Sequence, residues 1–143
     1  MSGHSLRGKT GERSGLFNEE ITPARVAEFA AAVCSTAPLG GVPPTFYTIL
    51  RRGEFELFQR LGIALSSVLH AEQEYVYLKP LSVGRGTHVS CDTEVTKFME
   101  KKGRETILKF MTFETRIFQG ERSIEDQTPI GLSRTTIVIR EKV

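Results

Sequence analysis

The chain has 143 residues, of which 39% are apolar and 25% are charged. A chain of this length buries roughly two-thirds of the surface that it exposes when unfolded, so one domain with a single core is expected. The formal net charge of +2 is too small to indicate nucleic acid or an anionic membrane as the main partner. The totals therefore describe an ordinary globular domain.

The first fourteen residues hold several charges and glycines but no apolar run. They have little apolar surface to offset the entropy of ordering, so we expect residues 1–14 to be a disordered tail and residues 15–143 to form the domain. The tail lacks the apolar stretch of a signal peptide, and no later segment approaches the roughly 18 apolar residues of a membrane span. A cytoplasmic protein without membrane association is expected.

Two helices are predicted after the tail. Thr22 is suited to cap the first, and Pro23 is suited to its first position. The apolar residues that follow keep the spacing of one helical face: Val26, Phe29, Ala30 and Val33. Residues 35–44 are rich in proline and glycine and are expected to be a loop.

The second helix is predicted to begin near Thr45. Its apolar residues are Phe46, Ile49, Leu50, Leu57, Phe58 and Leu61. Gly53 lies among them, although glycine inside a helix costs about 1 kcal/mol relative to alanine. Its presence indicates either a break in the helix or a close approach of the helix to a sheet.

From Leu69 onward the sequence reads as strands, with polar turn signals at residues 100–103 and 119–121. Ile107 to Phe118 is more apolar on both faces and is expected to be a central strand. Thr135 to Arg140 is expected to be the last strand, with Thr135, Ile137 and Ile139 facing inward. Residues 123–132 are ambiguous because Pro129 and Gly131 interrupt them. Two helices followed by a meander of strands indicate an α+β domain, with an antiparallel sheet wrapped around the second helix.

The strand from Leu69 to Leu78 is unusually polar. Because side-chain direction repeats every two residues, His70, Glu72 and Glu74 are expected on one face. That face is interpreted either as a solvated or hydrogen-bonded surface or as a substitute acid–base site carried by His70 and Glu72. The opposite face carries Gln73, Tyr75 and Tyr77, which either pack in the core or line an apolar channel.

Four segments resemble the hotdog fold, in particular the MaoC-like dehydratases and the related dehydratase N-terminal type domains. These segments are Ile21–Ala30, Val42–Phe46, Leu69–Tyr75 and Lys79–Gly84. In that family the strand after the central helix looks like His-Gly-Glu-Gln-Glu followed by aromatics and Arg-Pro-Leu, which is close to the segment here. The resemblance covers roughly Ile21 to the end of the chain.

The resemblance implies a hotdog fold and a protein that binds acyl chains joined by a thioester to coenzyme A or acyl carrier protein. It implies no metal and no other cofactor. It also implies a dimer of identical or unlike hotdog chains that pair across sheet edges, which removes exposed strand edges.

Competent members carry a Gly-Asp-x-Asn-Pro-x-His run just after the first helix, where Asp and His activate a water molecule. The corresponding run here is residues 34–40, aligned on Pro38, so Ser35 stands at the Asp position and Gly40 at the His position. Serine is no base near neutral pH without an activator, and glycine has no side chain. The resemblance therefore implies the non-catalytic, substrate-binding partner of a (3R)-hydroxyacyl hydratase or dehydratase.

The resemblance also implies residues that hold the acyl thioester. The start of the central helix could bind the thioester carbonyl through free amides. The residues assigned to substrate binding are Pro44, Thr45, Phe46, Gln73 and Tyr75.

Two other functions stay open. The first is thioester hydrolysis, with a carboxylate of Glu54, Glu56 or Glu72 orienting water. The second is a non-enzymatic regulatory module that binds an acyl thioester without turning it over. Cys34 and Cys91 have no neighbouring histidine that would activate a thiol, so both are expected to be packed rather than nucleophilic.

Overall fold

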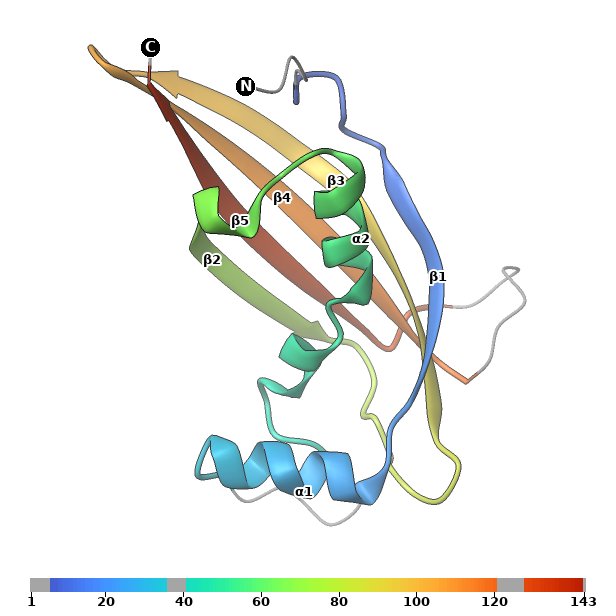
Figure 1. Ribbon diagram of the computed structural model, residues 1–143. Coiled ribbons are helices and arrows are strands. Elements are labelled where there is room, and N and C mark those ends of the chain that lie inside the picture. Colours follow the sequence, from blue (N-terminus) through green and yellow to red (C-terminus); the bar gives the residue numbers. More distant parts are fainter. Residues whose placement is uncertain (1–5, 36–40, 121–127, 143) are drawn as a thin grey trace.

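The computed structural model describes residues 6–35, 41–120 and 128–142. Five antiparallel strands form one sheet in the order β1-β3-β4-β5-β2, and the sheet curls around helix α2 (Figure 1). The strands are β1 (Arg13–Glu20), β2 (Val68–Tyr77), β3 (His88–Lys102), β4 (Thr106–Gln119) and β5 (Gly131–Lys142). The helices are α1 (Pro23–Ala32) and α2 (Arg52–Arg60), with the 3₁₀ turns η1 (Phe46–Ile49) and η2 (Leu65–Ser67). No helix in these described ranges is long and apolar enough to cross a membrane.

Helix α1 begins as predicted. The hydroxyl of Thr22 accepts a hydrogen bond of 3.1 Å from the amide of Arg25, which satisfies one of the free donors of the first turn. The helix lies beyond one end of the sheet (Figure 1). Its residue Phe29 packs edge to face on Phe46, with ring centroids 5.5 Å apart, so α1 is fastened to the segment that leads into α2.

The second predicted helix is divided into η1 and α2. Leu50 separates them with a non-helical backbone conformation and is almost fully buried. Of the two alternatives for Gly53, the close approach of the helix to the sheet is confirmed, because a Cβ atom there would lie 2.3 Å from Oγ1 of Thr93 on β3. The absent side chain lets the start of α2 approach the sheet.

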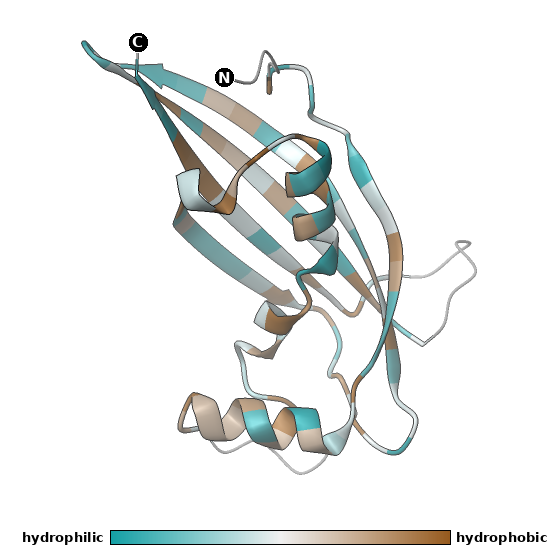
Figure 2. Cartoon of the chain, in the orientation of Figure 1, coloured by the Kyte–Doolittle hydropathy of each residue, from teal (hydrophilic) through white to brown (hydrophobic). Residues whose placement is uncertain are grey.

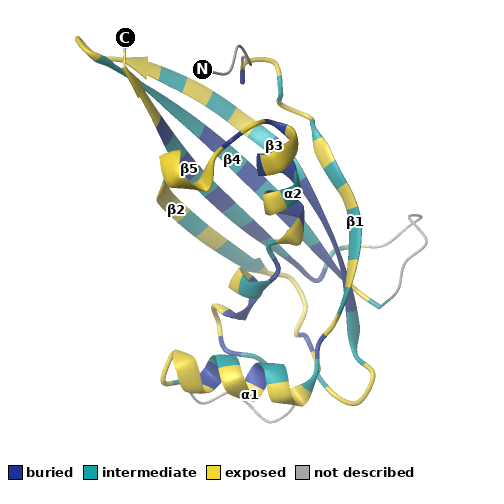
Figure 3. Ribbon diagram, in the orientation of Figure 1, coloured by how far each residue is buried: buried dark blue, intermediate teal, exposed yellow. Residues whose placement is uncertain are grey.

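The core lies between α2 and the inner face of the sheet. Figure 3 shows buried residues in alternation along the strands, and Figure 2 shows apolar and polar residues alternating along them. One cluster joins Leu57 and Phe58 of α2 to residues of three strands, which are Val95, Met111, Phe113, Ile137 and Ile139. A second cluster lies toward α1 and includes Phe46, Tyr47, Val89, Cys91 and Ile117. The predictions of a central strand in β4 and of an inward-facing Thr135, Ile137 and Ile139 in β5 are confirmed.

Strand β1 differs from the sequence-based expectation, which placed a disordered tail through Ser14. The strand starts at Arg13, and the amide of Gly11 already donates to the carbonyl of Val95 at 2.8 Å. Leu6 is buried in the core cluster under α2. The described part of the expected tail, residues 6–14, therefore packs against the domain, and residues 1–5 lie outside the described ranges.

Strand β2 contains a bulge that corrects one prediction. The pairing with β5 shifts between His70 and Glu72, so His70 lies opposite the inward-facing Ile137 whereas Glu72 lies opposite the outward-facing Thr136. The expectation that His70 shares a face with Glu72 and Glu74 is wrong, because one extra residue in a strand inverts the alternation. His70 faces the helical side of the sheet, and the two glutamates face away from it.

Candidate functional site

A polar site lies on the inner face of β2, where this strand meets η1 and the start of α2. Its centre is Glu54, whose side chain is only 1% exposed. Its Oε1 accepts a hydrogen bond of 2.9 Å from Nη2 of Arg51, and its Oε2 accepts one of 2.9 Å from the hydroxyl of Thr135. A carboxylate this buried is tolerable only when it is paired and hydrogen-bonded. Both of its oxygens are satisfied.

Gln73 continues this network toward the edge of the sheet. Its amide nitrogen donates to the hydroxyl of Ser133 at 2.9 Å, and its amide oxygen lies 2.9 Å from the hydroxyl of Thr135. The same amide oxygen lies 3.1 Å from Nε2 of His70. Because an amide oxygen only accepts, Nε2 of His70 is the donor in this contact. A polar chain thus runs from buried Glu54 to exposed His70.

Two tyrosines fasten β2 to the segment before α2. The hydroxyl of Tyr75 donates to Oγ1 of Thr48 at 2.5 Å, and that of Tyr77 donates to the carbonyl oxygen of Pro44. The ring of Tyr77 stacks on Tyr47 with centroids 4.6 Å apart. Burial raises the pKa of Tyr47 to about 12 and raises the pKa of Tyr77 above its usual value, so both stay neutral at physiological pH.

The residues predicted to bind substrate are partly brought together. Pro44, Gln73 and Tyr75 lie along the same edge of the site, and Thr45 is exposed beside Pro44. Phe46 is fully buried in the core cluster with α1, so its side chain packs there. The sequence did not indicate Thr48 and Ser133 as part of this site. The signal available for Ser133 was a polar residue at an inward position of β5, one alternation before Thr135.

Two positions of this chain correspond to the catalytic Asp and His of competent members, and the structure describes one of them. Ser35 follows α1, is half-buried, and its amide donates to the carbonyl of Ala30 at 2.8 Å. Gly40 lies outside the described residues. No group of three or more His, Cys, Asp or Glu side chains suited to hold a metal ion occurs in residues 6–35, 41–120 and 128–142.

The three carboxylates considered for hydrolysis lie in three different surroundings. Glu54 is buried and bonded as described above. Glu56 pairs with Arg60 one turn later, with 3.6 Å between the charged atoms. Glu72 lies on the outer face of the sheet, the face turned away from α2. They do not form one site.

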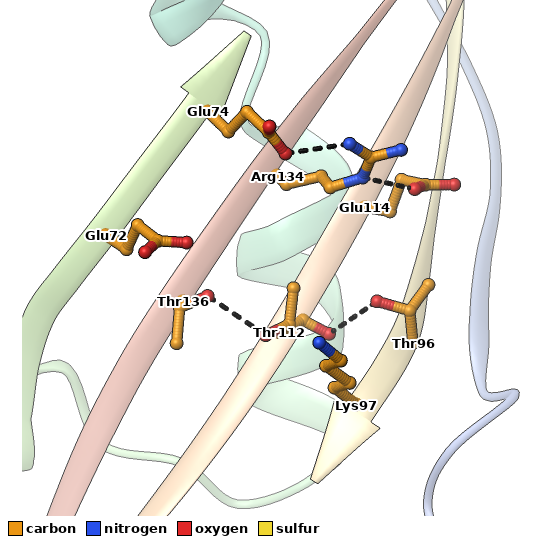
Figure 4. Close-up of a pocket in the computed structure, with 8 residues that line it drawn as sticks. All are labelled: Glu72, Glu74, Thr96, Lys97, Thr112, Glu114, Arg134 and Thr136. Carbon is orange, nitrogen blue, oxygen red and sulfur yellow. Dashed lines mark hydrogen bonds and ion pairs between the residues drawn. The ribbon is translucent and has the colours of Figure 1, made fainter. Parts of the chain in front are cut away.

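The outer face of the sheet, which points away from α2, has a hollow of about 370 Å³ that is separate from the polar site. Figure 4 shows the side chains that line it, with α2 behind the sheet: Glu72, Glu74, Thr96, Lys97, Thr112, Glu114, Arg134 and Thr136. Arg134 donates to both Glu74 and Glu114 at 2.7 Å, and these hydrogen bonds raise the pKa of Arg134 further. Most of the charge in this hollow is therefore neutralised within the sheet.

Strand β2 is an edge of the sheet, since it pairs only with β5 among the described strands. Large apolar side chains are exposed on α2, on η2 and around the end of β2: Phe55, Leu65, Tyr77 and Leu78. An unpaired strand edge beside exposed apolar surface is typical of an interaction site.

The fold is that of an α+β hotdog protein, and the predicted fold and the predicted resemblance to MaoC-like dehydratases are confirmed. Residues 40–127, more than half of the chain, match the family model of the FAS1-like, dehydratase domain region. The chain belongs to this family. No curated protein sequence matches it.

Three solved structures illustrate the likeness. A MaoC-like dehydratase gives a TM-score of 0.73 at 17% identity, covering 94% of this chain and 43% of that chain. The truncated HadBC complex of Mycobacterium tuberculosis, a 3R-hydroxyacyl-ACP dehydratase, gives 0.70 at 18% identity and covers 91% and 96%. The (R)-hydratase from A. caviae involved in PHA biosynthesis gives 0.64 at 20% identity and covers 93% and 98%. At such identities the likeness establishes the fold, and this chain spans less than half the length of the first of them.

Proposed function

We propose that this chain is the non-catalytic, acyl-thioester-binding subunit of a (3R)-hydroxyacyl hydratase or dehydratase built from two unlike hotdog chains. The observation that carries the proposal is a complete hotdog scaffold with Ser35 at the position where competent members have Asp. Among the described residues, no histidine or carboxylate is hydrogen-bonded to the Ser35 hydroxyl, so none of these residues activates it as a base.

The acyl thioester is proposed to lie along the inner edge of β2. Gln73 and Tyr75 are half-buried there, and their polar groups are oriented by Ser133 and Thr48. Fixed polar groups beside apolar surface are what a site needs to orient one end of a long apolar ligand. The carrier is coenzyme A or acyl carrier protein.

The catalytic partner is proposed to pair through the free edge of β2. Antiparallel addition of a second β2 strand would extend the sheet and cover the exposed Phe55, Leu65 and Leu78. The HadBC structure, whose fold this chain shares, is described as a complex. The partner would bring the Asp and His that this chain lacks next to the acyl chain held by β2.

The test is to co-express this chain with a hotdog chain, encoded beside it, that contains Gly-Asp-x-Asn-Pro-x-His. Hydration of crotonyl-coenzyme A is then measured for each chain alone and for the complex. We expect the complex to be active, this chain alone to be inactive, and an Asp→Asn change in the partner's run to abolish activity. Full activity of this chain alone would overturn the non-catalytic role.

Substrate binding is tested by variants of this chain within the complex. Gln73→Ala is expected to raise KM with little effect on kcat, because it removes binding that the ground state and the transition state share. Glu105→Gln, on the exposed turn between β3 and β4, serves as the matched control. An unchanged KM for Gln73→Ala, or no binding of acyl-coenzyme A in calorimetry, would contradict a substrate-binding role. Binding without turnover in any complex would favour the regulatory module instead.

A further inference from the structure

The outer face of the sheet carries an apolar row that crosses four strands. Strand pairing sets Leu69 opposite Val138, Val138 opposite Phe110, and Phe110 opposite Met99. Leu69 is 66% exposed and Met99 is 51% exposed, so the two ends of the row stand out into solvent. We call these four residues the apolar row. A continuous apolar strip of this kind on a sheet face is typical of a contact surface.

A polar row lies directly beside it and crosses the same four strands. Pairing sets Glu72 opposite Thr136, Thr136 opposite Thr112, and Thr112 opposite Lys97. The two threonine hydroxyls in the middle bond to each other at 2.9 Å. We call these four residues the polar row, and Figure 4 shows all of them on the near face of the sheet.

The ends of the polar row differ from the other charges nearby. Glu74, Arg134 and Glu114 are joined by ion pairs, and so are Arg116 and Asp92. The side chains of Glu72 and Lys97 make no ion pair and no hydrogen bond with any described residue. They lie three strand spacings apart, about 14 Å, which is too far for them to pair with each other. The polar row thus carries an unpaired negative charge at one end and an unpaired positive charge at the other.

We propose that a second copy of this chain packs face to face on this surface. A two-fold axis that runs along the strands between β4 and β5 exchanges the two ends of each row. It sets Glu72 of one copy over Lys97 of the other, twice, and it sets Leu69 over Met99. A surface that matches itself under a two-fold rotation is what an isologous dimer requires.

A second hollow on the outer face, between the apolar row and the polar row, supports the same arrangement. It has a volume of about 430 Å³ and is bordered by Glu72, Lys97, Met99 and Phe110. Face-to-face sheets lie about 10 Å apart with interdigitating side chains, so the protruding Leu69 and Met99 of the second copy reach this hollow. The contact leaves the edge of β2 free. A complex that pairs through that edge would therefore double to a tetramer through this face.

The test exchanges charges at the two ends of the polar row. Association is measured by sedimentation of the purified full chain as a function of concentration. Glu72→Lys alone and Lys97→Glu alone each create two like-charge contacts, so each is expected to weaken association at least about tenfold. An equimolar mixture of the two variants restores opposite charges at both contacts and is expected to associate as the unmodified chain does.

Three further samples complete the experiment. The double variant Glu72→Lys with Lys97→Glu is expected to associate normally, because each contact keeps opposite charges. Glu105→Lys, off both rows on an exposed turn, is expected to change nothing. Leu69→Ser removes apolar surface at an exposed position and is expected to weaken association as well. Circular dichroism checks that each variant is folded.

Two results would overturn the proposal. One is that neither single charge reversal weakens association beyond the Glu105→Lys control. The other is that both single variants weaken it but their mixture does not recover, which would mean that Glu72 and Lys97 do not meet across a two-fold axis. A folded variant of Leu69 that associates as strongly as the unmodified chain would remove the apolar row from the contact.

Discussion

Oε2 of Glu54 on α2 accepts a hydrogen bond of 2.9 Å from the hydroxyl of Thr135 on β5, in a part of the core where both residues are buried. This bond joins the central helix to the strand that neighbours β2. Thr135→Val keeps the shape of the side chain but removes the donor. We expect a loss of about 1–3 kcal/mol in the free energy of unfolding, because a buried carboxylate oxygen would lose a partner.

The matched control for this change is Thr136→Val on the same strand. Thr136 faces outward, and among the described residues its hydroxyl bonds only to that of Thr112, so the loss of this hydroxyl is expected to cost less than about 1 kcal/mol. Urea denaturation of both variants measures the difference. Equal losses for Thr135→Val and Thr136→Val would show that the bond to Glu54 contributes nothing beyond an ordinary surface hydroxyl pair.

Tyr47→Phe is expected to stabilise the protein. The Tyr47 side chain is fully buried, and its hydroxyl has no hydrogen-bond partner among the described residues. Removing an unsatisfied buried hydroxyl is expected to raise the free energy of unfolding by about 1 kcal/mol, since the stacked ring on Tyr77 remains.

Tyr75→Phe provides the comparison for that variant. Its hydroxyl is bonded to Thr48, so removing it is expected to lower the free energy of unfolding by about 0.5–1.5 kcal/mol. Thermal or urea unfolding of the two variants should therefore give changes of opposite sign. A destabilised Tyr47→Phe would mean that the hydroxyl of Tyr47 is satisfied in solution.

Gly53→Ala is expected to destabilise the protein although alanine is the better helix former by about 1 kcal/mol. The added methyl group would lie 2.3 Å from Oγ1 of Thr93, which is itself buried and bonded to Thr115. Overpacking of this kind costs about 1–3 kcal/mol. Gly84→Ala has open space around the new methyl group and is expected to stay within about 0.5 kcal/mol of the parent, so urea unfolding of the pair isolates the steric effect.

Gly53 also illustrates what the sequence could predict. A glycine amid helical apolar spacing indicates that a backbone comes close to something, and the structure supplies Thr93 as that neighbour. Helix α1, the central strand β4 and the inward side of β5 were predictable because each has a strong period or a clear cap.

The features that the sequence did not reveal are those set by distant parts of the chain. Strand β1 (Arg13–Glu20) has no clear alternation of polar and apolar residues. It is a strand because it pairs with β3. The bulge in β2 depends on the register against β5, and strict alternation placed His70 on the wrong face. Thr135, one of the two partners of Glu54, lies on a strand some eighty residues later, so no local pattern marked this carboxylate as the centre of a buried network.

The free energy of unfolding is expected to fall steeply at alkaline pH. Burial raises the pKa of the Cys91 thiol from 9.0 to about 12, and burial raises the pKa of Tyr47 from 10.0 to about 12. Below pH 9 both groups are neutral in the folded and the unfolded chain, and they do not change the balance. Between pH 9 and 12 they ionise only when the chain unfolds, so stability is lost as pH rises through this window.

Cys91 accounts for most of this loss at its onset, about 1 kcal/mol at pH 10, because its ordinary pKa is the lower of the two. Cys91→Val removes the titrating thiol and keeps an apolar side chain in the same core cluster. The difference in the free energy of unfolding between pH 8 and pH 10, measured in urea, should therefore be about 1 kcal/mol smaller for Cys91→Val than for the parent. Cys34→Val, at an exposed position, is the control and should leave that difference unchanged. An identical difference in all three proteins would mean that the Cys91 thiol ionises as readily in the folded chain as in the unfolded one.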